Sequence, residues 1–104
     1  MTQDFLRLED LEKSTFDPYV EQKFLIHFGV SERIEVELVN ISEVKSQKTE
    51  SFSLLFRGPF DKILAQGTYR MEHPKMGTFE LFLVPVMVAG DRSIHYEAVF
   101  NRLI

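Results

Sequence analysis

From residue 22 to its end, the chain alternates apolar and polar residues with a period of two, which is the pattern of half-buried β-strands. Glycine and proline interrupt the alternation where the chain must reverse, so the pattern divides into about six strands joined mostly by short turns. One face of these strands is mostly apolar, and a small sheet hides such a face by rolling up or folding over. The sequence therefore predicts a mainly β fold, an antiparallel meander that forms a small barrel or sandwich, with the strand order left open.

A short amphipathic helix is predicted ahead of the strands, over residues 4–13. Ser14 and Thr15 are expected to end this helix. Its apolar stripe recurs every three residues and consists of Phe5, Leu8 and Leu11.

A single turn of helix is predicted next, because Asp17 offers a side-chain acceptor and Pro18 lacks an N–H that the first helical position does not need. A chain of 104 residues has the size of one domain. We therefore expect one domain over 1–104, with the helix and turn in 1–20 and the antiparallel β domain in 22–104.

Composition excludes several classes of function. The 16 acidic residues outnumber the 12 basic ones, and the basic residues are scattered singly, so a nucleic-acid partner is not expected. The absence of cysteine rules out disulfides, thiolate metal sites and a cysteine nucleophile. The N-terminal stretch lacks the basic region and apolar core of a signal peptide, and no apolar run approaches the roughly 18 residues of a membrane span. We expect a cytoplasmic protein with no membrane partner.

Local irregularities in the alternation predict bends. The phase slips at Val39 and Asn40, as a β-bulge does. Residues 63–73 alternate as one long strand, in which Gly67 is expected to allow curvature. The predicted inward row of that strand is Ile63, Ala65, Gly67, Tyr69 and Met71.

A hairpin is predicted at His73-Pro74. Proline fixes the φ of the first turn position, and Gly77 supplies the left-handed conformation that closes a four-residue loop on a type I turn. We interpret His73 as the residue that enters this turn, with its ring capping a loop carbonyl.

The strand after this hairpin is apolar on both faces. Pro85 removes one backbone donor and predicts an edge position or a bulge. One face carries Phe79, Leu81 and Leu83, and the other carries Phe82, Val84, Val86 and Val88. Two elements could bury the second face. One is the N-terminal helix with Phe5, Leu8 and Leu11, which we favour, and the other is a partner subunit.

Polar candidates are few. His95 and Glu97 lie two apart, on the face of the last strand that is expected to meet solvent. His27 and His73 come from other strands without ligand spacing, so no metal site is predicted. No glycine-flanked nucleophile or phosphate-binding glycine loop occurs, and we expect no catalytic residue, no cofactor and no enzymatic activity.

Five ordered phrases resemble a family of small bacterial domains of unknown function, over nearly the whole chain from Phe16 onward. Relatives often carry glycine near Glu21 and Gln22, where this chain departs from the pattern. The phrases are FDPYVEQKF, ESFSLLFRGP, QGTYRMEHP, GTFELFLVPV and HYEAVFNR. The resemblance implies no assigned activity or cofactor, and it suggests a small accessory protein beside phage-tail-like components.

Three functions follow from these features. We favour a non-enzymatic protein-interaction or structural accessory module, which binds another protein or a second copy of itself through an edge strand or through the second face of the strand that carries Phe82. The first alternative is a small barrel that holds an apolar ligand among its phenylalanines. The second is an enzyme built on His73, His95 and Glu97.

Overall fold

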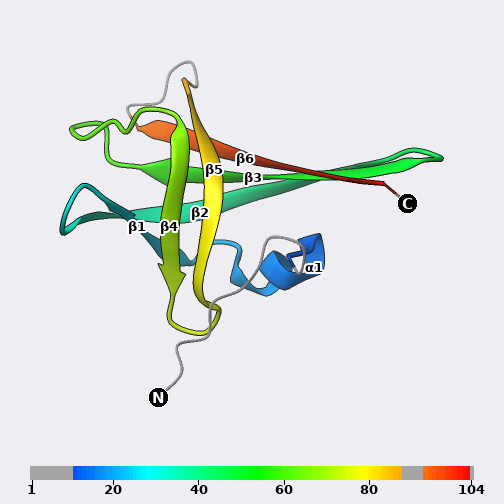
Figure 1. Ribbon diagram of the computed structural model, residues 1–104, viewed down its shortest axis with the longest axis horizontal. Helices are drawn as coiled ribbons and strands as arrows, with labels where there is room; N and C mark the ends of the chain where they lie inside the picture. The colour runs from blue at the N-terminus through cyan, green and yellow to red at the C-terminus, as the bar shows by residue number, and fades with distance from the viewer. Residues whose placement is uncertain (1–10, 88–92, 104) are drawn as a thin grey trace.

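The computed structural model describes residues 11–87 and 93–103 (Figure 1). Within these residues it contains one short helix, one 3-10 turn and six strands. Their bounds are α1 Lys13–Phe16, η2 Asp17–Tyr19, β1 Lys23–Phe28, β2 Glu32–Lys45, β3 Thr49–Gly58, β4 Gly67–His73, β5 Gly77–Val86 and β6 Ile94–Leu103.

The six strands close into a barrel with the order β1-β2-β3-β6-β5-β4, and every neighbouring pair is antiparallel. Two three-stranded meanders, β1-β2-β3 and β4-β5-β6, are therefore joined by the β3–β6 and β1–β4 ladders. The predicted mainly β fold is confirmed, and the barrel is the form that it takes. Closure removes most of the sheet edges that an open meander would leave unpaired.

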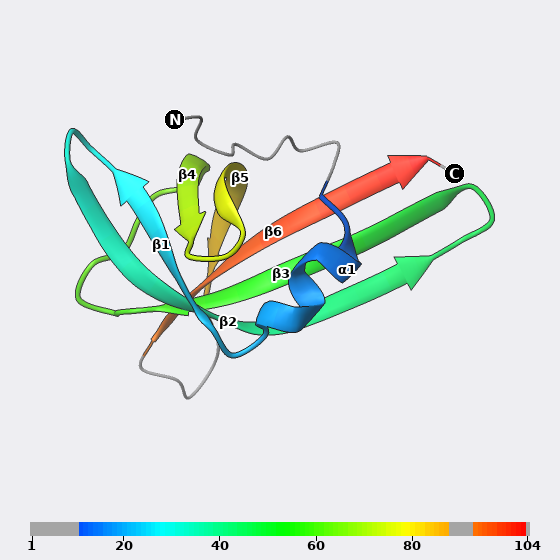
Figure 2. The same cartoon turned by 90° about the horizontal axis from the view of Figure 1, so that it is seen from below.

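Three strands continue beyond the barrel and form a projecting sheet (Figures 1 and 2). We call this sheet the arm, and define it as residues 40–45 of β2, 49–54 of β3 and 98–103 of β6, which remain paired in register. The ladder of β1 covers β2 only up to Glu37, and the ladder of β5 covers β6 only up to Glu97. Figure 1 shows the reason on the β6 side, because β4 and β5 run across β3 and β6 rather than along them.

The barrel interior is filled by the inward rows of all six strands, as the period-two pattern predicts. The predicted bulge is confirmed, because the β2–β3 register shifts between Leu38 and Asn40. This shift keeps Leu38 and then Ile41 on the inner face. The largest fully buried side chains are Tyr96, Phe16, Phe24, Phe56, Phe79, Leu11, Ile26, Leu38, Leu54, Met71, Leu81 and Leu83.

Within the described residues, the short N-terminal helix lies later in the chain than predicted. Leu11 and Glu12 are not helical, and α1 spans Lys13–Phe16, where Ser14 and Thr15 were expected to end a helix. The rest of the predicted 4–13 helix, with Phe5 and Leu8, lies outside the described residues. The predicted turn at Asp17-Pro18 is confirmed as η2. No helix within the described ranges has the length and apolarity needed to cross a membrane.

Phe16 explains where α1 sits. Its ring centroid lies 6.4 Å from Phe52, 5.8 Å from Phe79 and 6.2 Å from Phe100, so it fills the space between the arm and β5. Phe52 and Phe100 stack on each other at 4.4 Å with parallel planes. The helix therefore seals the barrel where β5 and β6 separate.

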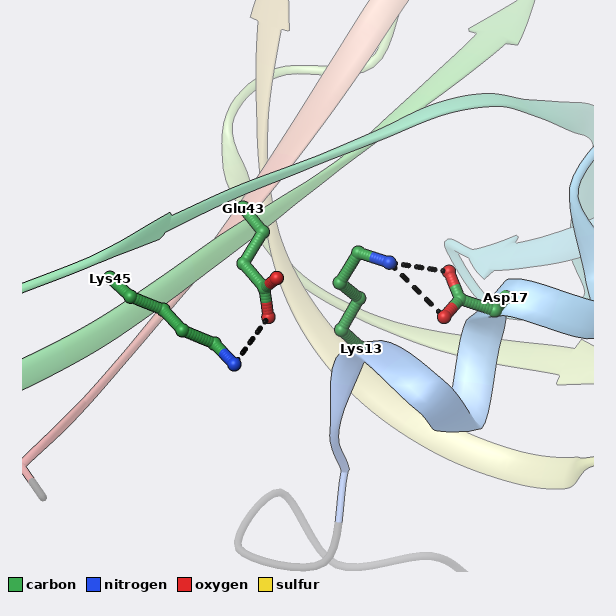
Figure 3. A network of polar contacts seen from close by, with 4 residues as sticks. All are labelled: Lys13, Asp17, Glu43 and Lys45. Atoms are coloured by element: carbon green, nitrogen blue, oxygen red, sulfur yellow. Dashed lines mark hydrogen bonds and ion pairs between the residues drawn. The ribbon is translucent and has the colours of Figure 1, made fainter.

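Figure 3 shows two surface ion pairs, one on the N-terminal segment and one on the arm. Lys13 Nζ lies 3.0 Å from an Asp17 carboxylate oxygen, one helical turn away on the N-terminal segment. On the arm, Lys45 Nζ lies 3.9 Å from Glu43. Both pairs are partly exposed, so each contributes little to the free energy of unfolding.

The predicted strand over residues 63–73 begins only at Gly67. The predicted inward residue Ile63 is 49% exposed and Ala65 is also exposed, whereas Leu64 is buried. The cause is Tyr96, whose buried hydroxyl accepts the Leu64 N–H at 2.9 Å and so turns Leu64 inward. Residues 59–66 are therefore a loop across the end of the barrel.

The hairpin at His73-Pro74 is confirmed, with Gly77 at a φ of 90°. His73 pairs in register with Gly77, so three residues rather than four lie between the paired positions.

Candidate interaction surface

The outer row of β5 is the most exposed apolar feature predicted from the sequence. Phe79, Leu81 and Leu83 of the inner row are buried, as predicted. On the outer row Phe82 is 53% exposed, whereas Val84 and Val86 are half-buried. Val88 lies outside the described residues.

Contrary to the favoured prediction, α1 and Leu11 do not cover the outer row of β5. Leu11 belongs to the buried core, and Phe16 packs on the inner-row residue Phe79. Phe5 and Leu8 lie outside the described residues. The ring of Phe82 thus stays accessible to a partner.

Val99 of β6 extends the apolar surface beyond β5, and sequence reasoning did not single it out. Val84 faces Glu97 in register, and Val99 is the next residue on the same face of β6, diagonal to Val84. Its side chain is 57% exposed. We call Phe82, Val84, Val86 and Val99 the β5–β6 patch. The signal in the sequence is the single valine in an outward row that otherwise reads His95, Glu97 and Asn101.

The predicted edge position of Pro85 is confirmed for one side of β5, because the β4–β5 ladder ends at Leu83. On the other side Pro85 faces Tyr96 within the β5–β6 ladder. An antiparallel ladder alternates hydrogen-bonded and non-hydrogen-bonded pairs, and a proline is accommodated at the second kind.

His73 is a buried structural residue at the end of β4. Its side chain is 3% exposed, between the rings of Tyr19 at 4.5 Å and Phe24 at 4.7 Å. Nδ1 accepts the N–H groups of Lys75 at 3.1 Å and Met76 at 3.2 Å. The ring therefore caps two amides, not the carbonyl that was expected. His73 thus accepts hydrogen bonds from two backbone amides of the turn, of which the Met76 amide is buried.

The opposite ring nitrogen fixes the state of this histidine. Because Nδ1 accepts two hydrogen bonds, the proton resides on Nε2, which donates to Gln22 Oε1 at 2.8 Å. Burial, helped by the charge of Lys75, lowers the pKa of His73 below its ordinary value. The neutral ring thereby joins the β4–β5 turn to the segment that precedes β1.

His95 is buried rather than solvent-facing. It is 5% exposed and lies in register between Arg57 and Val86, whereas Glu97 is half-buried between Leu55 and Val84. His73 is paired at the first residue of β5 and His95 at the last. With 10 residues in β5 at about 3.3 Å each, the two histidines are roughly 30 Å apart. The geometry therefore does not bring His73, His95 and Glu97 into one site.

His27 belongs to a separate polar surface on the outside of β1. Its Nε2 lies 2.9 Å from Glu72 Oε1. A hollow of about 560 Å³ opens beside it, where Arg33 and Arg70 flank His27 in register. Glu32 and Glu80 line the same hollow, so its charges largely balance. Within the described residues, no group of three metal-binding side chains converges.

Tyr96 is the main buried polar side chain of the barrel interior. Burial raises the pKa of Tyr96, so its hydroxyl stays protonated over the physiological range. This hydroxyl holds the loop at Leu64 and has a structural role.

No curated protein and no solved structure matches the chain. A family model described as "Domain of unknown function (DUF6916)" matches residues 11–100, which include all of α1 and β1 to β5 and most of β6, and the chain therefore belongs to this family.

Proposed function

We propose that this domain is a non-enzymatic protein-interaction or structural accessory module that binds another protein, or a second copy of itself, through the β5–β6 patch. The observation that carries the proposal is the exposure of Phe82 at 53% beside the half-buried Val84 and Val86. A buried Phe or Val side chain stabilises an association by about 1.5–3 kcal/mol relative to its exposed state. An apolar row on a rigid barrel strand is thus a ready docking surface.

The test replaces Phe82 with serine. We expect the wild-type chain to self-associate in light scattering at high concentration or to capture a protein from its host, and the Phe82→Ser variant to lose that binding. Far-UV circular dichroism should be unchanged, because the side chain faces solvent. Val30→Ser is the matched control, since Val30 is a fully exposed apolar residue in the β1–β2 turn. A wild-type chain that stays strictly monomeric and captures nothing contradicts the proposal.

We also propose that the partner is a component of a bacterial phage-tail-like assembly, in which this domain is an accessory. The support is the resemblance of the five phrases to a family of small bacterial domains, which suggests that association. Co-expression with the products of neighbouring genes, followed by size-exclusion chromatography, tests this assignment. Co-elution that depends on Phe82 is the expected outcome.

Two alternative functions receive less support from the geometry. A barrel that holds an apolar ligand needs an interior cavity, yet the inward rows meet one another and the fully buried side chains include Tyr96, Phe24 and Phe56. An enzyme built on His73, His95 and Glu97 needs those side chains within reach of one substrate, whereas His73 and His95 lie at opposite ends of β5.

A further inference from the structure

Among residues 11–87 and 93–103, none pairs with the edge of β6 that faces away from β3 in the arm. β5 pairs with β6 over three residue pairs only, from Val86↔His95 to Val84↔Glu97. Residues 98–103 of β6 continue to pair with β3 on their other side. Figure 1 shows β6 running on beyond the point where it crosses β5. Within the described part of the chain, this stretch is a strand with one free edge.

Pro85 identifies which backbone groups point to that edge. Because Pro85 has no N–H, its pair with Tyr96 is a non-hydrogen-bonded one, and the hydrogen-bonded pairs are Val84↔Glu97 and Val86↔His95. Odd-numbered residues of β6 therefore direct their N–H and C=O groups to the β5 side. By the same alternation, Val99 and Asn101 direct their N–H and C=O groups to the same side of β6, where β5 no longer pairs with it.

The other edge of the arm, on β2, is blunted. The bulge between Leu38 and Asn40 twists it, and the charged side chains of Glu43 and Lys45 follow. Bulges and edge lysines are the devices by which natural sheets prevent strand addition. The β6 edge has neither over residues 98–101, which read Ala-Val-Phe-Asn. The exposed apolar side chains beside this edge are Val99 and Phe82.

We propose that residues 98–103 of β6 receive an extended segment of a partner protein, which joins the arm as a fourth strand. Main-chain hydrogen bonds to Val99 and Asn101 supply affinity, and alternate apolar side chains of the segment pack on Val99 and Phe82. The inference rests on the proposed function and names its binding mode. The occupant is an extended, partly apolar peptide because the site offers a row of backbone donors and acceptors with an apolar flank.

The test uses a displayed library of random nine-residue peptides as the probe, selected on the wild-type chain. Val99→Pro removes the N–H that faces the free edge and keeps an apolar side chain. Lys45→Pro is the matched control on the opposite edge: Ser46 N–H bonds Thr49 on β3, so the N–H of Lys45 faces outward. We expect selected peptides to lose at least about tenfold in affinity for Val99→Pro and to bind Lys45→Pro unchanged. Equal binding to both variants, or no enriched peptide, overturns the inference.

Hydrogen exchange on the wild-type chain gives a readout that no variant can distort. Bound peptide should slow exchange at the Val99 and Asn101 amides, whereas the Ala98 and Phe100 amides already bond β3 and should change little. Protection at the second pair alone overturns strand addition. The two proposals also separate in capture from the host. If capture of a host protein is lost in Phe82→Ser but kept in Val99→Pro, the proposed function stands and strand addition is ruled out. If peptides bind in a Val99-dependent way but no host protein is captured, the proposed function is contradicted and the strand site is not.

Discussion

The free energy of unfolding is expected to depend on pH through the ring of His73. Protonation of Nδ1 would abolish the acceptor for the Lys75 and Met76 amides and place a charge beside Lys75. The pKa of His73 is lowered in the folded state, so the unfolded chain binds a proton at higher pH than the folded chain does. Between the unfolded pKa near 6.5 and the lower folded value, the free energy of unfolding therefore decreases as the pH falls.

We expect full stability from this residue above about pH 6.5 and a loss below it of at most about 1.4 kcal/mol per pH unit. Urea unfolding at a series of pH values measures the slope. In His73→Asn the amide oxygen can still accept a turn N–H without titrating, so the slope should be shallower between pH 6.5 and 5. Identical slopes in both proteins would show that groups other than His73 dominate this range.

Glu21 occupies a backbone conformation that suits glycine. Its φ is 72°, and its N–H donates to the Leu38 carbonyl at 2.7 Å, so the turn into β1 is held in place. The left-handed region is unfavourable for a residue with a Cβ, and the exposed side chain offers no compensating burial.

Glu21→Gly should therefore raise the free energy of unfolding by about 0.5–1 kcal/mol. Thermal and urea unfolding measure the change. Glu21→Ala keeps the strained conformation and should differ little from the wild type. A destabilised glycine variant would mean that lost chain entropy outweighs the relieved strain.

At the scale of the elements, close packing at the end of β3 depends on Gly58. A Cβ at Gly58 would lie 3.0 Å from a Val36 methyl and 3.2 Å from the Tyr96 ring. Close packing thus requires glycine at Gly58, whereas the sequence pattern pointed to Gly67, as a site of curvature. A Cβ at Gly67 would meet only the Tyr69 ring, at an ordinary 3.8 Å.

Gly58→Ala should lower the free energy of unfolding by about 1–3 kcal/mol through overpacking. Gly67→Ala, the matched control, should change it by no more than about 0.5 kcal/mol. In a Val36→Ala background the nearest clash disappears, and the effect of Gly58→Ala should shrink. An equal loss at both glycines would point to chain entropy rather than packing. Urea unfolding of the five proteins gives the comparison.

The elements were predictable where one local rule decided them. Alternation gave β1, β2 and β3, and the phase slip at Val39 gave the bulge. Alternation failed in residues 63–66, because a loop with a buried Leu64 can show the same apolar spacing as a strand. The C-terminal end of the helix was misplaced because the stripe ending at Leu11 satisfies a helical period, whereas Phe16 packs against residues of three distant strands.

At the scale of the whole molecule, strand order was not predictable from local pattern. Which strand meets β6 depends on the β3–β6 and β1–β4 ladders, and these pair residues far apart in the chain. The same limit applies to the site. Exposure of Phe82 followed from its place on a two-faced strand, but the free edge at Val99 exists only because β5 turns away from β6. Pro85 indicates which residues of β6 direct their backbone N–H and C=O groups to the free edge. This could be inferred only once its partner Tyr96 was known.

The long-range ladders also determine how the barrel folds. His27 and Glu72, which pair across β1 and β4, are 45 residues apart in the chain. Closing such loops is entropically unfavourable until both ladders form, so we expect refolding in milliseconds to seconds rather than microseconds. The chain has no tryptophan, so stopped-flow tyrosine fluorescence or circular dichroism is the appropriate measurement.

Two matched truncations locate the late step. Leu54 lies on the β3–β6 ladder opposite Ala98, and Leu81 lies on the local β4–β5 hairpin opposite Tyr69; both are fully buried. Each change to alanine should lower the free energy of unfolding by about 2–5 kcal/mol. If the local hairpin forms before the barrel closes, Leu81→Ala slows refolding, whereas Leu54→Ala mainly accelerates unfolding. The reverse partition would mean that the β3–β6 ladder nucleates folding, and that the arm is the first part of the molecule to become ordered.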